Sequence, residues 1–306
     1  NVWMSHGDNV SKVPKDFKII ASSNNKTISI IENKKKKIYG LQFHPEVEHT
    51  QNGKELIKKF IFSICKVKQN WILEDFISNK TKELKKLIGN NNVICGLSGG
   101  IDSSVTAYLL HKAVGKKLFC IFIDHGLLRK GEAEEVDNYF KNKFGKNFVN
   151  INAANLFINK LKGITNSEKK RKIIGKTFID IFNKEANNIL NVKFLAQGTL
   201  YPDIIESISY FGSPTAKIKS HHNVGGLPAK MKLKLIEPLR ELFKDEVRLL
   251  GKKLKLNPKL VNRHPFPGPG LAIRIPGAIN KNKIRLLKEI DAIYINFLKE
   301  KKLYQK

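Results

Sequence analysis

The fold of this chain is decided by one short stretch, Val93-Ile94-Cys95-Gly96-Leu97-Ser98-Gly99-Gly100-Ile101-Asp102-Ser103-Ser104. Its first five residues are apolar throughout, which is typical of a strand buried on both faces of a sheet. A glycine-rich turn follows. After the turn, Val105, Tyr108 and Leu109 recur at the spacing of one helix face. The stretch therefore predicts a strand, a tight turn and a helix in direct succession.

The same pattern repeats on either side of this stretch. Apolar runs at 118–124, 148–151 and 194–198 predict three further buried strands. Residues 71–87 and 132–144 carry apolar side chains at helical spacing. Short apolar strands that alternate with helices form a parallel sheet covered on both faces. We therefore expect an α/β fold with a doubly wound parallel sheet, in which ligands bind at the carboxyl ends of the strands.

The two ends of the chain carry different patterns. Residues 28–31 and 38–43 predict two strands, and 56–64 predicts a helix that closes the N-terminal segment. Near the other end, the rigid proline- and glycine-rich loop 264–270 precedes a predicted strand and a helix at 281–298. We expect three segments, with the bounds 1–68, 69–264 and 265–306.

The composition excludes several classes of protein. With 41% hydrophobic residues in 306 positions there is material for two domains, and neither an 18-residue apolar run nor a secretory leader occurs, so we expect no membrane association. The net charge of +29 comes from 56 Lys and Arg against 27 Asp and Glu, but only seven are Arg, the residue that binds phosphates and bases as a fork. Because Lys and Asn are abundant together, we expect a solvated basic surface and no nucleic-acid partner. Three cysteines without a CxxC pair, Cys65, Cys95 and Cys120, predict buried, reduced thiols and a cytoplasmic location.

The turn that follows residue 97 has the chemistry of an anion site. Gly99 and Gly100 let a phosphate approach the N–H groups at the start of a helix. Asp102 supplies a carboxylate of the kind that Mg²⁺ prefers. Further hydroxyl donors are available on Ser98, Ser103 and Ser104. The structural alternative is a plain turn with a polar helix cap.

The turn is not a Walker A loop. The chain has one Gly-Lys-Thr, at 175–177, but Lys170 stands where the first glycine of that motif belongs. Ser98-Gly99-Gly100-Ile101-Asp102-Ser103 instead resembles the SGGxDS motif of the N-type ATP pyrophosphatases, the PP-loop family. The resemblance implies a loop that binds the pyrophosphate part of ATP, with Mg²⁺, while an acceptor oxygen attacks the α-phosphate. The ATP-binding residues it implies are Ser98, Gly99, Gly100, Ile101, Asp102, Ser103, Ser104 and Asp124.

Five longer strings, at 122–129, 168–175, 197–207, 218–228 and 264–272, resemble the GMP synthases within that family, in the same order along the chain. The resemblance implies ligase activity that makes GMP from XMP, ATP and glutamine-derived ammonia through an adenylyl-XMP intermediate. It also implies a homodimer, with 265–306 as the start of an α+β dimerisation domain.

Further site residues follow from this resemblance. Asp203 and Glu206 lie three residues apart, so that one helical turn presents both carboxylates on the same face. The family resemblance assigns this pair to adenylylation, with Asp203 as a second metal ligand beside Asp102. A helix N-terminus that carries acidic residues is the alternative. The resemblance implies a catalytic lid with Lys219, His221 and His222, and XMP contacts by Arg171, His264, Pro269 and Gly270.

The string Gly40-Leu41-Gln42-Phe43-His44-Pro45-Glu46 resembles the end of a class I glutamine amidotransferase. That reaction needs a thiolate to attack the amide, a histidine to move the proton and a carboxylate to orient the ring. The resemblance assigns the last two roles to His44 and Glu46. No cysteine precedes His44, so we expect that these 306 residues alone cannot hydrolyse glutamine. The resemblance also places XMP-phosphate contacts beyond residue 306, so we expect these residues to bind ATP but to bind XMP poorly.

Two alternatives remain open at this point. The loop and the basic surface also fit a PP-loop enzyme that modifies tRNA, although the paired reactive cysteines of such enzymes are missing. The chain could instead be an inactive remnant that binds ATP or forms dimers. Pyrophosphate release that depends on XMP and not on tRNA would separate the synthase from both.

Overall fold

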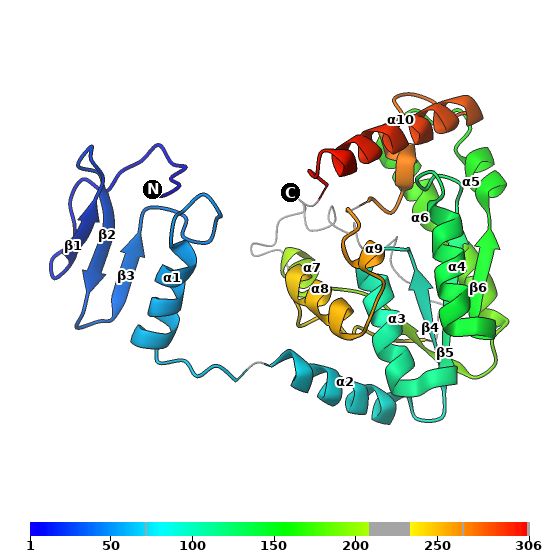
Figure 1. Ribbon diagram of the computed structural model, residues 1–306, viewed down its shortest axis with the longest axis horizontal. Helices are drawn as coiled ribbons and strands as arrows, with labels where there is room; N and C mark the ends of the chain where they lie inside the picture. The colour runs from blue at the N-terminus through cyan, green and yellow to red at the C-terminus, as the bar shows by residue number, and fades with distance from the viewer. Residues whose placement is uncertain (71, 208–232, 265, 305–306) are drawn as a thin grey trace. The chain divides into compact units, whose positions relative to one another are not determined.

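The computed structural model describes residues 1–70, 72–207, 233–264 and 266–304. The chain forms two compact units, Asn1–Trp71 and Ile72–Lys306 (Figure 1). Each unit is described by itself below.

The second unit is built on a five-stranded sheet in the order β6-β5-β4-β7-β8, in which every neighbouring pair is parallel. This confirms the predicted doubly wound parallel sheet. The strand β8 was not anticipated, because three residues are too few to show a pattern. The strands are β4 Asn92–Leu97, β5 Leu118–Asp124, β6 Phe148–Asn152, β7 Val192–Ala196 and β8 Lys234–Ile236.

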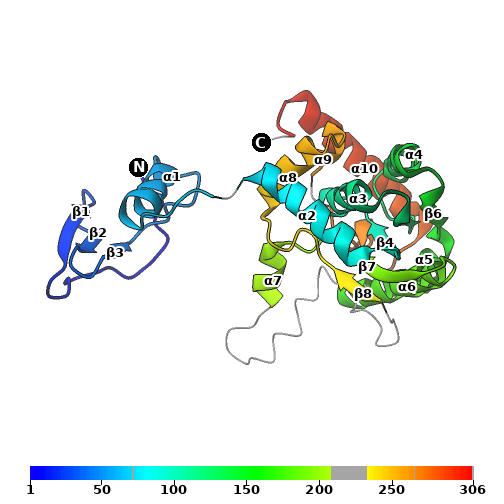
Figure 2. The same cartoon turned by 90° about the horizontal axis from the view of Figure 1, so that it is seen from below.

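Helices cover both faces of this sheet, because alternate residues of each central strand point to opposite sides. Cys95 and Phe122 belong to a core shared with α2 (Leu73–Ile88), α3 (Ile101–Val114), α4 (Glu132–Phe144) and α8 (Lys244–Lys253). Ile121 and Ile123 pack on the other side, with α5 (Ala154–Lys160) and α6 (Ser167–Asn187). Figure 2 shows α3 and α6 on opposite sides of the sheet. The remaining helices are α7 Tyr201–Ser207, α9 Pro258–Val261 and α10 Lys281–Glu300.

The prediction of a strand after the proline- and glycine-rich loop 264–270 is wrong. Residues Gly270–Arg274 form a short 3₁₀ helix that leads into α10. Leu271 and Ala272 are fully buried, and Ala272 belongs to the core on the face covered by α6. The buried ammonium of Lys170 binds the carbonyl oxygens of Ala272 and Ile275. In a sheet, these carbonyl groups would accept hydrogen bonds from a neighbouring strand. Here the Lys170 side chain, which comes from α6, binds them instead.

The first unit has little interior. Three antiparallel strands, β1 (Lys18–Ser22), β2 (Ile28–Asn33) and β3 (Ile38–Leu41), are followed by α1 (Gly53–Lys58) and a π-helix at Lys59–Ile64. None of the hydrophobic side chains in residues 1–70 is fully buried. Cys65 is exposed, so the expectation of three buried thiols holds only for the other two cysteines.

Candidate functional site

The loop between β4 and α3 is shaped by hydrogen bonds among its own serines. The Oγ of Ser103 accepts from the backbone N–H of Ser98 at 3.2 Å, and the two hydroxyls lie 3.0 Å apart. The N–H of Gly100 points to the Oγ of Ser98 at 3.3 Å. The Ser104 side chain is fully buried and donates to the carbonyl of Gly100 at 2.7 Å. Of the three serines, Ser104 therefore stabilises the turn, whereas Ser98 and Ser103 line it.

A lysine that the sequence analysis missed lies at the centre of this site. The Nζ of Lys244 contacts both carboxylate oxygens of Asp102, at 2.7 and 2.6 Å. Lys244 is the first residue of α8, where the helix dipole disfavours a positive charge, so the nearby carboxylate offsets an unfavourable position. A lysine at the start of an otherwise acidic first turn, followed here by Asp245 and Glu246, was the available sequence signal.

The ends of three strands converge on this loop. β4 and β7 are neighbours although β5 and β6 lie between them in sequence, which makes the gap between them the switch point where such sheets bind ligands. Gly198, just after β7, lies so close to Asp102 that a Cβ would meet its carbonyl oxygen at 3.1 Å. The N–H of Tyr201 donates to the carbonyl of Leu242, after β8, at 3.0 Å.

The other residues predicted for this site are placed as follows. Asp203 caps its own helix, because its Oδ2 accepts from the N–H of Leu200 at 2.9 Å. The Oδ1 of Asp124, at the end of β5, accepts from the N–H of Gly126 at 2.8 Å. The predicted lid residues Lys219, His221 and His222 lie outside the described residues, and so does the side chain of Glu206.

Mg²⁺ is compatible with the donors present at the loop. The ion is usually held by one or two carboxylates together with the phosphates of the substrate, and Asp102 and Asp203 are of that kind. The described residues contain no cluster of three or more metal-ligating side chains, so phosphate oxygens would have to complete the shell. Both Asp102 oxygens already contact Lys244, and a carboxylate retains lone pairs for a second partner.

A second candidate site lies in the first unit. The Nδ1 of His44 is 2.8 Å from the Oε1 of Glu46, and both side chains are about half exposed. Backbone hydrogen bonding and the contact with His44 lower the pKa of Glu46. The chain around His44 is held by Trp3, whose carbonyl accepts from the His44 N–H at 2.9 Å. The pair has the geometry of a base and the carboxylate that orients it.

The two buried cysteines do not supply the thiolate that this pair would need. Burial raises the pKa of Cys95 to about 12 and raises that of Cys120 well above its ordinary value. Both thiols are therefore protonated and unreactive at neutral pH.

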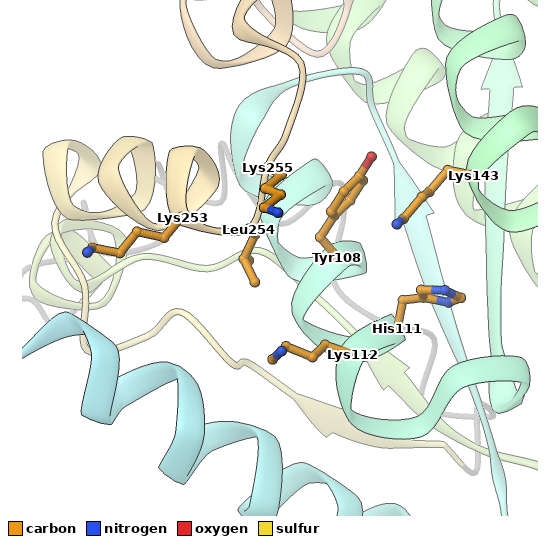
Figure 3. A pocket seen from close by; sticks show the side chains of 7 residues that line it. All are labelled: Tyr108, His111, Lys112, Lys143, Lys253, Leu254 and Lys255. Atoms are coloured by element: carbon orange, nitrogen blue, oxygen red, sulfur yellow. The ribbon is translucent and has the colours of Figure 1, made fainter.

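A cavity of about 330 Å³ lies away from the loop, among Tyr108, His111, Lys112, Lys143 and residues 253–255 (Figure 3). Lys112, Lys143 and Lys253 come from the last turns of α3, α4 and α8, where positive side chains complement the helix dipoles, and Lys255 follows the end of α8. The loop lies at the opposite end of α3. The cavity is therefore separate from the site at the switch point.

Comparisons with known proteins match both parts of the chain to known families. Residues 1–64 match the glutamine amidotransferase class-I family, and residues 72–173 match the NAD synthase family. The glutamine-hydrolysing GMP synthase of Zymomonas mobilis is 53% identical over 303 residues, and that of Fusobacterium nucleatum is 54% identical over 305 residues. These alignments cover 99% and 100% of this chain. The chain belongs to the GMP synthase family.

The chain spans 58% and 59% of the length of these two GMP synthases. Among solved structures, the NMN synthetase of Francisella tularensis has a TM-score of 0.51 at 14% identity, and the match covers 78% of this chain and 97% of that one. At this identity the likeness concerns the fold alone, and it agrees with the parallel sheet.

The residues predicted to contact XMP from the GMP synthase resemblance are placed as follows. Arg171 is on α6 and pairs with Glu168 at 2.7 Å. The ring of His264 stacks on Tyr304 with centroids 4.0 Å apart. Pro269 and Gly270 begin the 3₁₀ helix that packs against the turn after β5, where the N–H of Leu271 donates to the carbonyl of Leu127 at 2.8 Å.

Proposed function

We propose that the protein containing this chain makes GMP from XMP, ATP and ammonia released from glutamine, with AMP and pyrophosphate as by-products. The observation that carries the proposal is the serine- and glycine-lined loop at the β4–β7 switch point, with the Lys244–Asp102 pair beside it. Membership of the GMP synthase family supports XMP as the acceptor, and the NAD synthase match of residues 72–173 supports the use of ATP.

In this proposal the N–H groups and the hydroxyls of Ser98 and Ser103 bind the two phosphates that leave together. Lys244 offsets the negative charge that grows on them as the XMP oxygen attacks the α-phosphorus. Mg²⁺ held by Asp102 and Asp203 would supply further charge neutralisation. Glu206, Lys219, His221 and His222 remain proposed catalytic residues, and Arg171, His264, Pro269 and Gly270 remain proposed XMP contacts.

Residues 1–64, which match the amidotransferase family, have only part of a glutaminase site in this proposal. We propose that His44 moves the proton during attack on the glutamine amide and that Glu46 orients its ring, with the thiol supplied from outside these 306 residues. The proposal includes a homodimer, a cytoplasmic location and no nucleic-acid partner. Across residues 1–70, 72–207, 233–264 and 266–304, no helix has the length and apolarity needed to cross a bilayer.

The test uses the protein that contains this chain, at the full length of its relatives, with ATP, Mg²⁺, XMP and ammonium. We expect AMP and pyrophosphate in equal amounts, and release that depends on XMP and not on tRNA. Formation of ADP and orthophosphate would contradict the proposal. Lys244→Met should lower turnover by about 10²-fold, the typical cost of losing one electrostatic stabiliser of the transition state. Lys252→Met, at the exposed far end of α8, is the matched control and should leave turnover unchanged.

A further inference from the structure

Within the loop proposed to bind the anion, the peptide unit between Gly99 and Gly100 is the one that can flip most easily. Gly99 has a φ of +75°, and glycine on both sides leaves either orientation of the peptide sterically open. In the structure two hydrogen bonds set its orientation: one within the loop, in which the Gly100 N–H donates to the Ser98 Oγ at 3.3 Å, and one from a distant part of the chain. The Nη1 of Arg263 donates to the carbonyl oxygen of Gly99 at 3.3 Å.

Arg263 is itself firmly held. Its Nη1 lies 2.9 Å from Glu132 Oε1, and its Nη2 lies 3.1 Å from Glu135 Oε2. The Arg263 side chain is 13% exposed and that of Glu132 is 7% exposed, so the pair is largely shielded from solvent. The second oxygen of Glu132 accepts from the N–H of Arg129 at 3.1 Å. The guanidinium therefore has a fixed position from which to bind the loop.

The direction of the Gly99 carbonyl decides what the loop offers to an anion. In a trans peptide the C=O and the following N–H point in opposite directions. With the Gly99 oxygen on Arg263, the Gly100 N–H is directed to the side of the Ser98 hydroxyl. If the peptide turned over, a partly negative oxygen would take the place of that N–H and repel phosphate.

We propose that Arg263 is a positioning residue for phosphate binding, which holds the Gly99–Gly100 peptide in the orientation that presents an N–H group to the anion. The inference rests on the proposed function, in which this loop binds the pyrophosphate part of ATP. Arg263 lies between α9 and the segment 266–304, 164 residues away from Gly99. The anion loop is therefore complete only when this later part of the chain has folded against it.

The test measures binding of inorganic pyrophosphate and of ATP by calorimetry, with the full 306-residue chain. Arg263→Met should weaken binding of both by about tenfold or more, as expected for the loss of a charge-assisted hydrogen bond that orders the site. Arg263→Lys, which keeps the charge but not the fork, should fall between this variant and the wild type. Arg248→Met is the control, because Arg248 pairs with the exposed Asp245 at the surface of α8.

A second variant separates positioning from stability. Arg263→Met leaves Glu132 as a buried charge without its cationic partner, and this destabilises the chain independently of any effect on the loop. Arg263→Met combined with Glu132→Gln removes both charges and should restore the melting temperature, while pyrophosphate binding stays weak. In this double variant the Gly100 amide, observed in ¹⁵N-glycine spectra, should broaden as the peptide exchanges between orientations, and it should stay sharp in Arg248→Met.

The possible outcomes separate the positioning role of Arg263 from the proposed function. A folded double variant that binds pyrophosphate as the wild type does, with a sharp Gly100 amide, would overturn the positioning role and leave the proposed function intact. A wild-type chain that binds neither pyrophosphate nor ATP would overturn the proposed function, and the positioning role with it.

Discussion

At the scale of single residues, burial governs the chemistry of the turn after β5. His125 is 2% exposed, and its Nδ1 accepts from the N–H of Leu127 at 3.1 Å. Its ring lies against Phe157 and Phe178, with centroids 5.7 and 5.2 Å away. Burial, and then the positive charge of Lys288, lower the pKa of His125 to about 4. The neutral ring is therefore the form that the fold requires.

This lowered pKa predicts a pH dependence of stability. The unfolded chain takes up a proton at this histidine near pH 6.5, whereas the folded chain does so only near pH 4. Stability should therefore fall as the pH falls from about 6.5 to 4, by of order 3 kcal/mol from this residue. His125→Asn keeps an acceptor for Leu127 but does not titrate. Urea unfolding at several pH values should show a smaller loss for this variant, and an equal loss would contradict the assignment.

At the scale of elements, close backbone approach joins the last segment to the sheet. Gly270 has a φ of +62°, and a Cβ there would lie 2.3 Å from the carbonyl oxygen of Leu127 and 2.8 Å from the ring of His125. Lys170 of α6 binds the same 3₁₀ helix from the other side through the carbonyls of Ala272 and Ile275. The segment is thus positioned by contacts with two elements that precede it in the chain.

Gly270→Ala should undo this docking. The methyl group collides with backbone that cannot move aside, and the positive φ adds strain, so we expect a loss of about 3 kcal/mol or more in unfolding free energy. Gly268→Ala, two residues earlier, is the matched control, because a Cβ there meets nothing within 4 Å. Thermal unfolding should show a large decrease for the first variant and almost none for the second. Similar melting temperatures would exclude the proposed close contact.

At the scale of the whole molecule, the two units differ in what stabilises them. The second unit buries a continuous core on both faces of its sheet. In residues 1–70, the buried side chains belong to Ser29, Asn33 and Thr50, which are polar, whereas Trp3, Ile19 and Ile20 are about half exposed. Apolar burial is the main favourable contribution to folding, so the first unit should open at a much lower free energy.

Hydrogen exchange of the 306-residue chain can measure this difference. Both β2 and β4 are central strands with a neighbour on each side, so neither is an unpaired edge strand. We expect the amides of β2 to exchange at least about 10²-fold faster than those of β4, because opening the first unit exposes little apolar surface. Equal protection of the two strands would show that the first unit is as stable as the second.

Local patterns were sufficient for much of the molecule. The uninterrupted apolar runs of β4 and β5 predicted buried parallel strands, and the spacing of apolar residues predicted α4 and α10 almost to their ends. The strand expected between the loop 264–270 and the helix at 281–298 was wrong, because an apolar run can be buried equally well by a helix. The roles of the predicted site residues stay predictions.

The sequence by itself determined the α/β fold, the glycine-rich turn between β4 and α3 and the contact of His44 with Glu46, because each depends on residues that are close together in the chain. Only the tertiary structure decided that Lys244 contacts Asp102 and that Arg263 holds Gly99, across 142 and 164 residues. The physical reason is that these contacts form where the ends of strands and the segments that connect them come together in space. The spacing of residues along the sequence does not indicate which distant side chains meet there. The positions of the charged side chains around the loop are therefore determined by tertiary packing.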